Sequence, residues 1–364
     1  MLRYPANKKI YLFVMLCMMT KFVMGQNKSY SAKERAILIE RQINQYFRDS
    51  LNQLYYENNK QSAKENEHSF LWPLCALMQG ANEMEVLFPK KKYLEPVLIA
   101  IEKYNNPAPP AAGYQAKVAA EGKDTRYYDD NQWIGIAAID AYHRTKKKAY
   151  LALAEKTHRL MMTGLDTVSG GGIYWREGDL STKNTCSNGP GVLLALQLYK
   201  ATGKKGYLDT AILIYKWTNE KLQAPDGLFH DAIKLPSLKL DKHIYSYNSG
   251  TMLQANVILH QLTKQEAYLT EAKRIAGSAE RYFFREGRFV DNYWFSVVLF
   301  RGFISLYEND RAKLRIFREA VDHVWEEQRD ADGLMGKRKR KSLIDQAALL
   351  EIYARLAHLE IEDD

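Results

Sequence analysis

Apolar residues recur with the spacing of α-helices along most of the chain, and the alternation typical of strands is almost absent. Two kinds of helical segment are present. In the first kind, apolar residues occur all round the helix, as in residues 70–78, 132–142, 188–199, 248–262, 293–307 and 342–359. In the second kind, they form a stripe along one side, as in residues 32–55, 92–104, 146–161, 203–220, 264–281 and 309–325.

Several of the one-sided segments are copies of a single unit. Each copy begins with charged turn residues, continues with Tyr-Leu and runs on as an amphipathic helix. The copies are KKKAYLALAEKTHRLM (146–161), GKKGYLDTAILIYKWTNE (203–220) and KQEAYLTEAKRIAGSAER (264–281), with NDRAKLRIFREAVDHVW (309–325) as a looser copy. A Gly-rich or aromatic loop and a segment of the all-round kind follow each copy, so the repeating element is a helical hairpin.

The alternation of these segments predicts the fold. A helix that is apolar all round must be buried, whereas an amphipathic helix can cover it from outside. Six hairpins in two concentric rings satisfy both demands, so we predict an all-α protein in which residues 26–364 form one (α/α)6 barrel. A superhelical solenoid is the alternative. In a closed ring, the loops before the inner helices meet at one end, where we expect the pocket.

The N-terminus has the pattern of a secretory signal peptide over residues 1–25. Arg3, Lys8 and Lys9 precede an apolar stretch at 10–20, and Gly25 offers a cleavage site. The stretch is too short for a stable membrane span. We therefore expect an exported monomer, periplasmic or secreted. Cleavage removes four positive charges and no acid, so the formal net charge falls from +9 to +5.

Composition and charge exclude several functions. The chain is 46% hydrophobic and 26% charged, which is ordinary for a globular protein. KRKRK at 337–341 follows a Gly-containing turn and precedes an apolar helix, which favours a solvated loop over a nucleic-acid site. No zinc-ligand spacing, P-loop or Rossmann glycine pattern occurs, so we expect no nucleic-acid partner, no metal and no cofactor. Cys75 and Cys186 remain after processing, and we expect free thiols.

Aromatic residues gather in the loops before the inner segments. The chain has 24 Tyr and 6 Trp, many of which cannot be fully buried. Such rings can stack on sugars or pack between loops. Asn, Asp and Ser in the same loops, such as Asn248, Asp291 and Ser187, are also favoured N-caps. The aromatic residues are Tyr127, Tyr128, Trp133, Tyr174, Trp175, Tyr245, Tyr247 and Trp294.

Two adjacent aspartates, Asp129 and Asp130, lie in the motif YYDDNQW, where an inner helix begins. One can cap the helix and accept backbone N–H bonds, which lowers its pKa, while the other lies beside that charge among rings, which raises its pKa. Such a pair suits a nucleophile and a proton donor in glycoside hydrolysis. Adjacent residues can bring their carboxyl groups to about 5–5.5 Å, the separation of a retaining enzyme. A cap beside a solvated acid is the simpler alternative.

The motifs YYDDNQW, GGGIYWRE, NTCSNGPGVLLALQLY and YNSGTMLQANVIL together resemble glycoside hydrolase family 76, the α-1,6-mannanase family. The similarity runs in order from about residue 30 to 358. It implies an (α/α)6 barrel that cleaves α-1,6-linked mannan backbones with retention. It also implies that Asp129 is the nucleophile and Asp130 the general acid/base.

Further substrate-binding residues are predicted from the aromatic loops and from these motifs. Gln132 matches a family position that contacts the sugar, and Asp231, in GLFHDA, matches one that offers an acid. One segment, 291–307, follows the family pattern only loosely around Arg301 and Gly302, which leaves endo or exo action open, although we expect endo action. The other predicted contacts are Tyr128, Trp133, Trp72, Tyr174, Trp175, Asn188, Tyr247 and Asn248.

Three other functions remain open at this point. The first is a transglycosylase that remodels mannose-containing wall glycans. The second is a lyase on acidic polysaccharide, which the acid pair and the neutral amides of the loops disfavour. The third is a non-catalytic glycan-binding protein on the same toroid, which would need the aromatic loops but not both aspartates.

Overall fold

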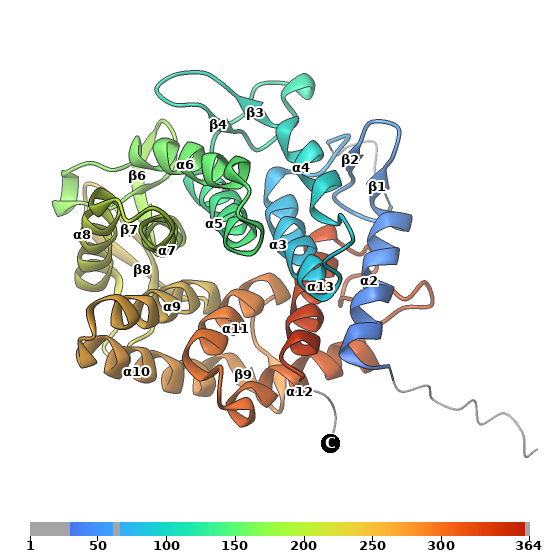
Figure 1. Cartoon of the computed structure of the whole chain (residues 1–364). Helices are drawn as coiled ribbons and strands as arrows, with labels where there is room; N and C mark the ends of the chain where they lie inside the picture. Colours follow the sequence, from blue (N-terminus) through green and yellow to red (C-terminus); the bar gives the residue numbers. More distant parts are fainter. Residues whose placement is uncertain (1–29, 61–65, 361–364) are drawn as a thin grey trace, which may run out of the picture.

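The helices form two concentric rings, which Figure 1 shows in a view along the barrel. The computed structural model describes residues 30–60 and 66–360, so the predicted signal peptide lies outside the described residues. The inner ring consists of α3 (Leu71–Leu87), α5 (Tyr128–Thr145), α7 (Thr185–Thr202), α9 (Ser246–Thr263), α11 (Tyr293–Tyr307) and α13 (Leu343–His358). The outer ring consists of α2 (Ala32–Tyr46), α4 (Leu94–Glu102), α6 (Lys148–Met162), α8 (Lys205–Leu222), α10 (Glu266–Phe283) and α12 (Arg311–Glu327).

The ring closes between the last helix and the first two. Helix α13 packs against both α2 and α3, and every inner helix packs against the next one round the ring. The predicted (α/α)6 barrel is therefore confirmed, and the alternative of an open solenoid is wrong. Burial follows the two sequence patterns, because α9 is buried nearly all round whereas α10 buries one face. Among the described helices, none has both the length and the apolar character needed to cross a membrane.

Three turns from an inner to an outer helix share one geometry, which is the structural counterpart of the sequence repeat. Each inner helix ends in a threonine whose hydroxyl donates to the carbonyl four residues earlier and accepts the N–H two residues later. A residue with left-handed backbone follows each threonine. The threonines are Thr145, Thr202 and Thr263, and the left-handed residues are Lys146 (φ 57°), Gly203 (φ 70°) and Lys264 (φ 59°).

Short strands, which the sequence pattern did not predict, join the loops at the other end of the barrel. The α6–α7 and α8–α9 loops build one antiparallel sheet of order β5-β6-β7-β8, in which Thr182 pairs with Lys234 and Asn184 with Ala232. Its strands are β5 (Tyr174–Arg176), β6 (Asp179–Asn184), β7 (His230–Lys234) and β8 (Lys239–Ile244). Three two-stranded hairpins are β1 (Arg48–Asp49) with β2 (Leu54–Tyr55), β3 (Asn105–Asn106) with β4 (Gly113–Tyr114), and β9 (Phe284–Arg285) with β10 (Arg288–Phe289); two 3-10 turns are η1 (Ala119–Glu121) and η2 (Val168–Gly170).

One predicted helix boundary is wrong. The segment 32–55 was expected to be a single helix, but α2 ends at Tyr46 and the hairpin β1–β2 follows. The side chain of Asp49 accepts the N–H groups of Leu51 and Asn52, at 3.0 and 3.1 Å, and so closes a turn that competes with the helix.

Buried ion pairs hold the inner helices α3, α11 and α13 together. Arg301 donates to both carboxylate oxygens of Glu351 at 2.6 Å, and both side chains are almost fully buried. Arg355 bonds to Glu351 at 2.8 Å and to Glu83 at 2.9 Å. Because each charge has a bonded partner of opposite sign, the cluster avoids the large desolvation cost of an unpaired buried charge.

Candidate active site

A cavity of about 790 Å³ opens where the inner helices begin. Trp72 lies at the start of α3, Cys186 at the start of α7 and Tyr247 at the start of α9, and all three line it. The loops between outer and inner helices supply the remaining wall. Seven of the twelve predicted site residues lie on this lining, namely Asp129, Asp130, Trp72, Trp133, Trp175, Asp231 and Tyr247.

The two aspartates lie in the first turn of α5, and neither of them is its N-cap. The cap residue is Tyr127, without a side-chain capping bond, so the expectation that one aspartate caps the helix is wrong. The amide of Asn131 donates to the carbonyl of Tyr127 at 2.8 Å, which fixes Asn131 against the residue before the helix. Both carboxylates are therefore free to face the cavity instead of the helix end.

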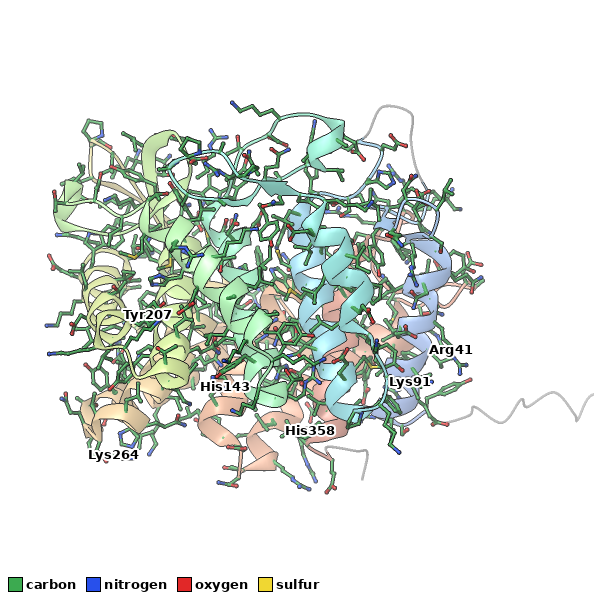
Figure 2. The ribbon with its side chains drawn as sticks, turned by 45° about the horizontal axis from the view of Figure 1, so that its top comes forward. Arg41, Lys91, His143, Tyr207, Lys264 and His358 are labelled. Carbon is green, nitrogen blue, oxygen red and sulfur yellow. The ribbon has the colours of Figure 1, made fainter. Side chains whose placement is uncertain are left out.

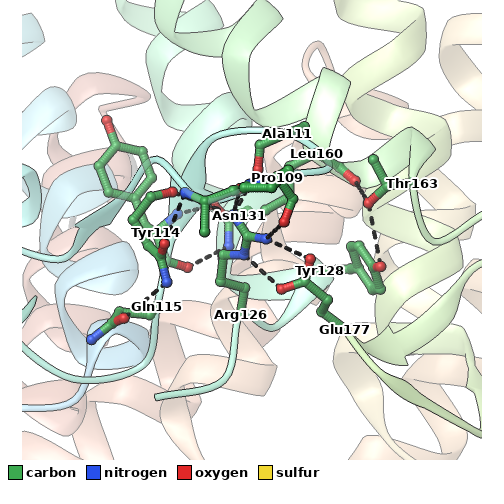
Figure 3. Close-up of polar contacts among 12 residues, drawn as sticks. Pro109, Ala111, Tyr114, Gln115, Arg126, Tyr128, Asn131, Leu160, Thr163 and Glu177 are labelled. Atoms are coloured by element: carbon green, nitrogen blue, oxygen red, sulfur yellow. Dashed lines mark hydrogen bonds and ion pairs between the residues drawn. The ribbon is translucent and has the colours of Figure 1, made fainter. Parts of the chain in front are cut away.

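The carboxamide at the fourth residue of an inner helix anchors the loop before it, and this arrangement recurs round the ring. Asn131 accepts the N–H of Tyr114 at 2.8 Å and donates to its carbonyl at 2.9 Å (Figure 3). Asn188 does the same to Ile173, at 2.8 and 2.9 Å. On α13, Gln346 pairs in the same way with Met335. These side chains hold the loops in place over the cavity.

Arg126, just before α5, organises the loop that precedes the aspartates. Its guanidinium is buried and forms an ion pair with Glu177, beyond β5 (Figure 3). It also donates to four backbone carbonyls of one loop, those of Asn106, Ala108, Pro109 and Ala111. Since one side chain joins the loops on both sides, the start of α5 has a defined position relative to β5.

Three donors surround Asp129. The indole Nε1 of Trp175 donates to Oδ2 at 3.2 Å, and the backbone N–H of Asp130 donates to Oδ1 at 3.0 Å. The thiol of Cys186 provides a third hydrogen bond. Burial raises the pKa of Asp129 to about 6, and the three donors keep it from rising further because they stabilise the charged carboxylate. The sequence-based expectation of a lowered pKa is thus wrong for this residue.

Asp130 has the higher pKa of the pair. Burial, and then the negative charge of Asp129, raise the pKa of Asp130 well above its ordinary value. The predicted difference between the two acids therefore has the expected order, with Asp129 ionising first. An ionised carboxylate beside a protonated one can supply a nucleophile and a proton donor at the same pH.

Aromatic rings form the walls of the cavity. Tyr127 packs edge-on against Trp175, with ring centroids 5.1 Å apart, on the side of Asp129. In a second group of rings on the lining, Phe295 stacks on Tyr247 at 4.0 Å and approaches Trp72 at 6.3 Å. Trp72 and Trp175 remain 39% and 36% exposed, so their faces are accessible to a ligand. Exposed rings along a polar cleft are suited to stacking on sugar rings.

The floor of the cavity is rigid. Trp133 and Trp294 meet edge to face at 5.5 Å, and the guanidinium of Arg301 lies over both rings, at 5.3 and 5.1 Å. Arg301 is itself fixed by its ion pair with Glu351. The segment that follows the family pattern loosely thus supplies a support for the acid-bearing helix.

Asp231 brings a third carboxyl group to the cavity. Burial raises its pKa, and a hydrogen bond from Asn248, at 3.4 Å, opposes the rise. Asn248 itself is fully buried and does not line the cavity. Its contact to Asp231 makes it a positioning residue rather than one that meets a ligand.

Four more predicted site residues lie away from the lining. Gln132 is fully buried and donates to the carbonyl of Ser187 at 2.7 Å, which joins α5 to α7. Tyr128 packs against Gly164, and Tyr174 donates to Asp166 at 2.8 Å. The fourth is Asn188, the loop anchor described above, whose amide also donates to the carbonyl of Asn184 at 2.7 Å.

Two of the lining residues that were missing from the predicted set contact predicted ones directly. Cys186 hydrogen-bonds with Asp129 and with Tyr247, and Phe295 stacks on Tyr247. Cys186 stands two residues from the predicted Asn188, and Phe295 follows Trp294, one of the aromatic loop residues, so proximity in the sequence is the signal that could have identified them. Cys186 and Cys75 are free thiols, as expected. Cys75 donates to the backbone carbonyl of Asp130 at 3.3 Å.

One group of described residues, Glu67, His68 and Glu121, has metal-ligand chemistry. Both ring nitrogens of His68 already bond to carboxylates, those of Glu121 and Asp49. Burial alone would lower the pKa of His68, but these two hydrogen bonds raise it above its ordinary value. A protonated ring that donates from both nitrogens has no lone pair for a metal, so the group acts as an ionic link between loops.

The fold and the cavity together define a carbohydrate-active (α/α)6 toroid. Residues 31–314 match the model of glycosyl hydrolase family 76, and the chain belongs to this family. A family 76 α-mannanase of Bacteroides thetaiotaomicron is 26% identical, with a TM-score of 0.85 and coverage of 91% of this chain and 97% of that one.

Two other relatives are more distant or shorter in overlap. The mannan endo-1,6-alpha-mannosidase DCW1 of Saccharomyces cerevisiae is 27% identical over 175 residues, which are 44% of this chain and 39% of the yeast protein. The chain thus spans less than half the length of the curated relatives it matches. An inactive α-1,6-mannanase variant of Salegentibacter, with two consecutive aspartates replaced by asparagine and α-1,6-mannotriose bound, shares the fold; it is 23% identical, with a TM-score of 0.74 and coverage of 90% and 100%.

Proposed function

We propose that this protein is an endo-acting, retaining glycoside hydrolase that cleaves α-1,6-mannosidic bonds in mannan backbones. One observation carries the proposal: two adjacent carboxyl groups, Asp129 and Asp130, line a cavity between exposed aromatic rings and have pKa values raised to different extents. Glycosidases that retain configuration need this division between an ionised and a protonated acid.

In the proposed mechanism, protonated Asp130 donates its proton to the glycosidic oxygen as the bond to the anomeric carbon breaks. Asp129 attacks that carbon, and a covalent mannosyl-enzyme forms through an oxocarbenium-like state. Asp130, now a carboxylate, takes a proton from water, whose oxygen displaces Asp129. The donors on Asp129, above all Trp175 and Cys186, keep it ionised and hold it in one orientation.

The remaining cavity residues are proposed to bind the chain of sugars. Trp175 and Tyr127 form one group of rings beside Asp129, and Trp72, Phe295 and Tyr247 form a second group on the same lining, so the sugars have apolar faces to stack on in both. The raised pKa of Asp231 leaves that carboxyl able to donate or accept a hydrogen bond to a sugar hydroxyl. The bound α-1,6-mannotriose of the Salegentibacter relative supports a mannose chain as the ligand.

The test is incubation with debranched α-1,6-mannan, with products separated by size and their anomeric form followed by NMR. Endo hydrolysis releases a range of oligosaccharides early in the reaction, and retention gives the α-anomer first. Release of mannose alone would exclude endo action, and the β-anomer would exclude retention. Elongated products in the presence of added mannobiose would show a transglycosylase, and binding without any cleavage would show a glycan-binding protein.

Roles of the two acids are separable with activated substrates. Asp130→Ala should lose most activity on mannan but keep bond cleavage on an aryl mannoside whose leaving group needs no proton, with restoration of turnover by azide. Asp129→Ala should lose both activities. Near-full activity of Asp129→Ala on mannan would contradict the assignment.

A further inference from the structure

The turns that lead from inner to outer helices lie at the end of the barrel opposite the cavity. Helix α5 starts at the acids and runs 18 residues to Thr145, a length of about 27 Å at the rise of an α-helix. All the inner helices begin at the cavity end, so their last residues share the far end. Figure 2 shows Lys91, His143, Lys264 and His358 at that end, away from the loops that carry β3 and β4.

Positive charge is concentrated on three consecutive turns of this end. The turns α3–α4, α5–α6 and α7–α8 carry exposed lysines at 90–92, 146–148 and 204–205. Residues 89–95, 145–149 and 203–207 contain these eight lysines and one acid, Glu95. The three turns together carry a formal net charge of +7, and we call the surface that they form the lysine end.

Few of these lysines have ionic partners. Lys92 pairs with Glu95 at 3.2 Å and Lys204 with Glu155 at 3.0 Å. Within the described part of the chain, the other six lysines form no ion pair. Their charges are therefore exposed to solvent and add up over the surface instead of cancelling locally.

The backbone of these turns does not require lysine. Gly203 and Lys146 occupy the same left-handed position in the repeated turn, and glycine adopts that conformation at lower cost than a residue with a side chain. Lys264 stands at the equivalent position of the α9–α10 turn. Lysine at these positions is thus unfavourable for the turn itself, which points to a use for its charge.

The described chain also begins at the lysine end. The Nζ of Lys33, in the first turn of α2, lies 4.9 Å from the ring centre of Phe88, in the α3–α4 turn. The first described residues therefore lie near this surface.

We propose that the lysine end docks on a membrane surface that contains anionic lipids, and that this docking points the catalytic cavity away from the bilayer. Lysines near an anionic bilayer are attracted individually, and the contributions of several add up. The turns of one barrel end lie roughly at one level, which matches a planar partner. An acidic glycan would instead be expected to bind along the cleft, at the opposite end.

The test uses the chain from Gln26, which retains the whole barrel and lacks the apolar stretch at 10–20. Its binding to vesicles is measured by co-sedimentation, with phosphatidylcholine alone and with equal parts of phosphatidylcholine and phosphatidylglycerol. We expect binding to the mixed vesicles only, and its loss as salt is raised. Absence of binding to the mixed vesicles would overturn the proposal.

A matched pair of variants locates the contact. The lysine-end variant carries glutamine at Lys90, Lys91, Lys147, Lys148 and Lys205, and the control carries glutamine at Lys123, Lys234, Lys239, Lys242 and Lys339, exposed residues of the cavity-side loops. Both lose five charges. We expect the lysine-end variant to bind at least tenfold more weakly and the control to change less than twofold, with kcat/KM on soluble mannooligosaccharides unchanged in both. Equal weakening of vesicle binding in the two variants would show an effect of net charge alone. Tighter binding to soluble polygalacturonate than to mixed vesicles of the same total charge would show a glycan partner. Either result overturns the proposal.

Discussion

The indole N–H of Trp175 donates to Oδ2 of Asp129 over a distance of 3.2 Å, and so joins the loop after α6 to the first turn of α5. The same indole is 36% exposed in the cavity. One side chain therefore offers a face to a ligand and a donor to the proposed nucleophile. Its two functions can be separated by substitution.

Replacement of Trp175 with phenylalanine keeps a ring but removes the donor. We expect kcat on α-1,6-mannan to fall about 10- to 100-fold, the scale for loss of one hydrogen bond to a charged group. In a profile of kcat/KM against pH, the apparent pKa of the acidic limb should rise, because the charged form of Asp129 loses a hydrogen bond.

Trp72→Phe is the control, since no hydrogen bond joins Trp72 to either acid within the described residues. It should raise KM and leave the acidic limb in place. An unchanged acidic limb in Trp175→Phe would contradict the role of the indole.

The pH dependence of activity should follow the two acids. Asp129 must be ionised and Asp130 protonated, so kcat/KM should rise as the pH passes about 6, the raised pKa of Asp129, and fall once Asp130 loses its proton at higher pH. Because the acids interact, both limbs belong to the pair. A profile of kcat/KM on mannan from acid to alkaline pH gives the limbs directly. Full activity well below pH 6 would contradict the ionised state assigned to Asp129.

The two buried thiols should differ in effect. Cys186 bonds to the carboxylate of Asp129, whereas Cys75 donates to the backbone carbonyl of Asp130 at 3.3 Å. Cys186→Ala should therefore move the acidic limb of the profile upward and lower kcat, and Cys186→Ser, which keeps a donor, should restore most of both. Cys75→Ala should leave the limb unchanged. Equal shifts in the two alanine variants would indicate packing and not the hydrogen bond.

The burial of Asp129 should cost stability at neutral pH. Its pKa in the folded protein, about 6, lies above the unfolded value of about 3.9. Below pH 4, Asp129 is protonated in both the folded and the unfolded chain, and its burial costs no stability through ionisation. That stability is lost as the pH rises through 6, because the unfolded chain ionises more readily than the folded protein. Asp129→Asn should thus match the wild type near pH 4 and unfold with a free energy higher by about 1–3 kcal/mol above pH 7.

Asp179 provides a control of opposite sign for this measurement. Hydrogen bonds with Ser181 and Arg176 lower the pKa of Asp179 to about 2, so its contribution is present at neutral pH and is lost only in strong acid. Asp179→Asn should therefore destabilise the protein at pH 7. Thermal melts of both variants between pH 4 and 8 test the signs, and a less stable Asp129→Asn at pH 7 would contradict the argument.

Two ion pairs with the same N–O distance should contribute differently to the free energy of unfolding. Arg301 and Glu351 are 2.6 Å apart and buried, and Arg288 and Glu327 are 2.6 Å apart and exposed. Glu351→Gln leaves the buried charge of Arg301 without its ion-pair partner and should lower the free energy of unfolding by about 3–5 kcal/mol. Glu327→Gln should lower it by about 0–1 kcal/mol. Urea unfolding of both variants makes the comparison, and similar losses would show that burial does not govern the pair.

The fold followed from the sequence because helical periodicity is a local property. The alternation of segments apolar all round with one-sided segments predicted which helices lie inside, and the barrel confirms it. The sheet β5-β6-β7-β8 was not predicted, because its central strands β6 and β7 come from different loops, with Thr182 opposite Lys234. Helix α2 was expected to run too far because the turn at Asp49 depends on one local side-chain bond.

Motif spacing located the acids and most of the aromatic lining, but it did not tell which polar residues face the cavity. Asn188 and Gln132 stand in the same motifs as lining residues, yet both are fully buried and bond to backbone carbonyls. Cys186, two residues from Asn188, faces Asp129 instead. A helix turns by about 100° per residue, so neighbours in one motif point to different surroundings.

The order and kind of the helices, the place of the acid pair at a helix start and the lysines of the turns were all determined by the sequence. Tertiary structure alone decided that α13 closes the ring on α2 and α3, that Trp175 and Cys186 meet Asp129, and that the lysine turns share one end. The physical reason is the range of the interactions. Periodicity and turn chemistry act within a few residues, whereas burial, pKa values and the summed charge of a surface depend on groups that only folding brings together.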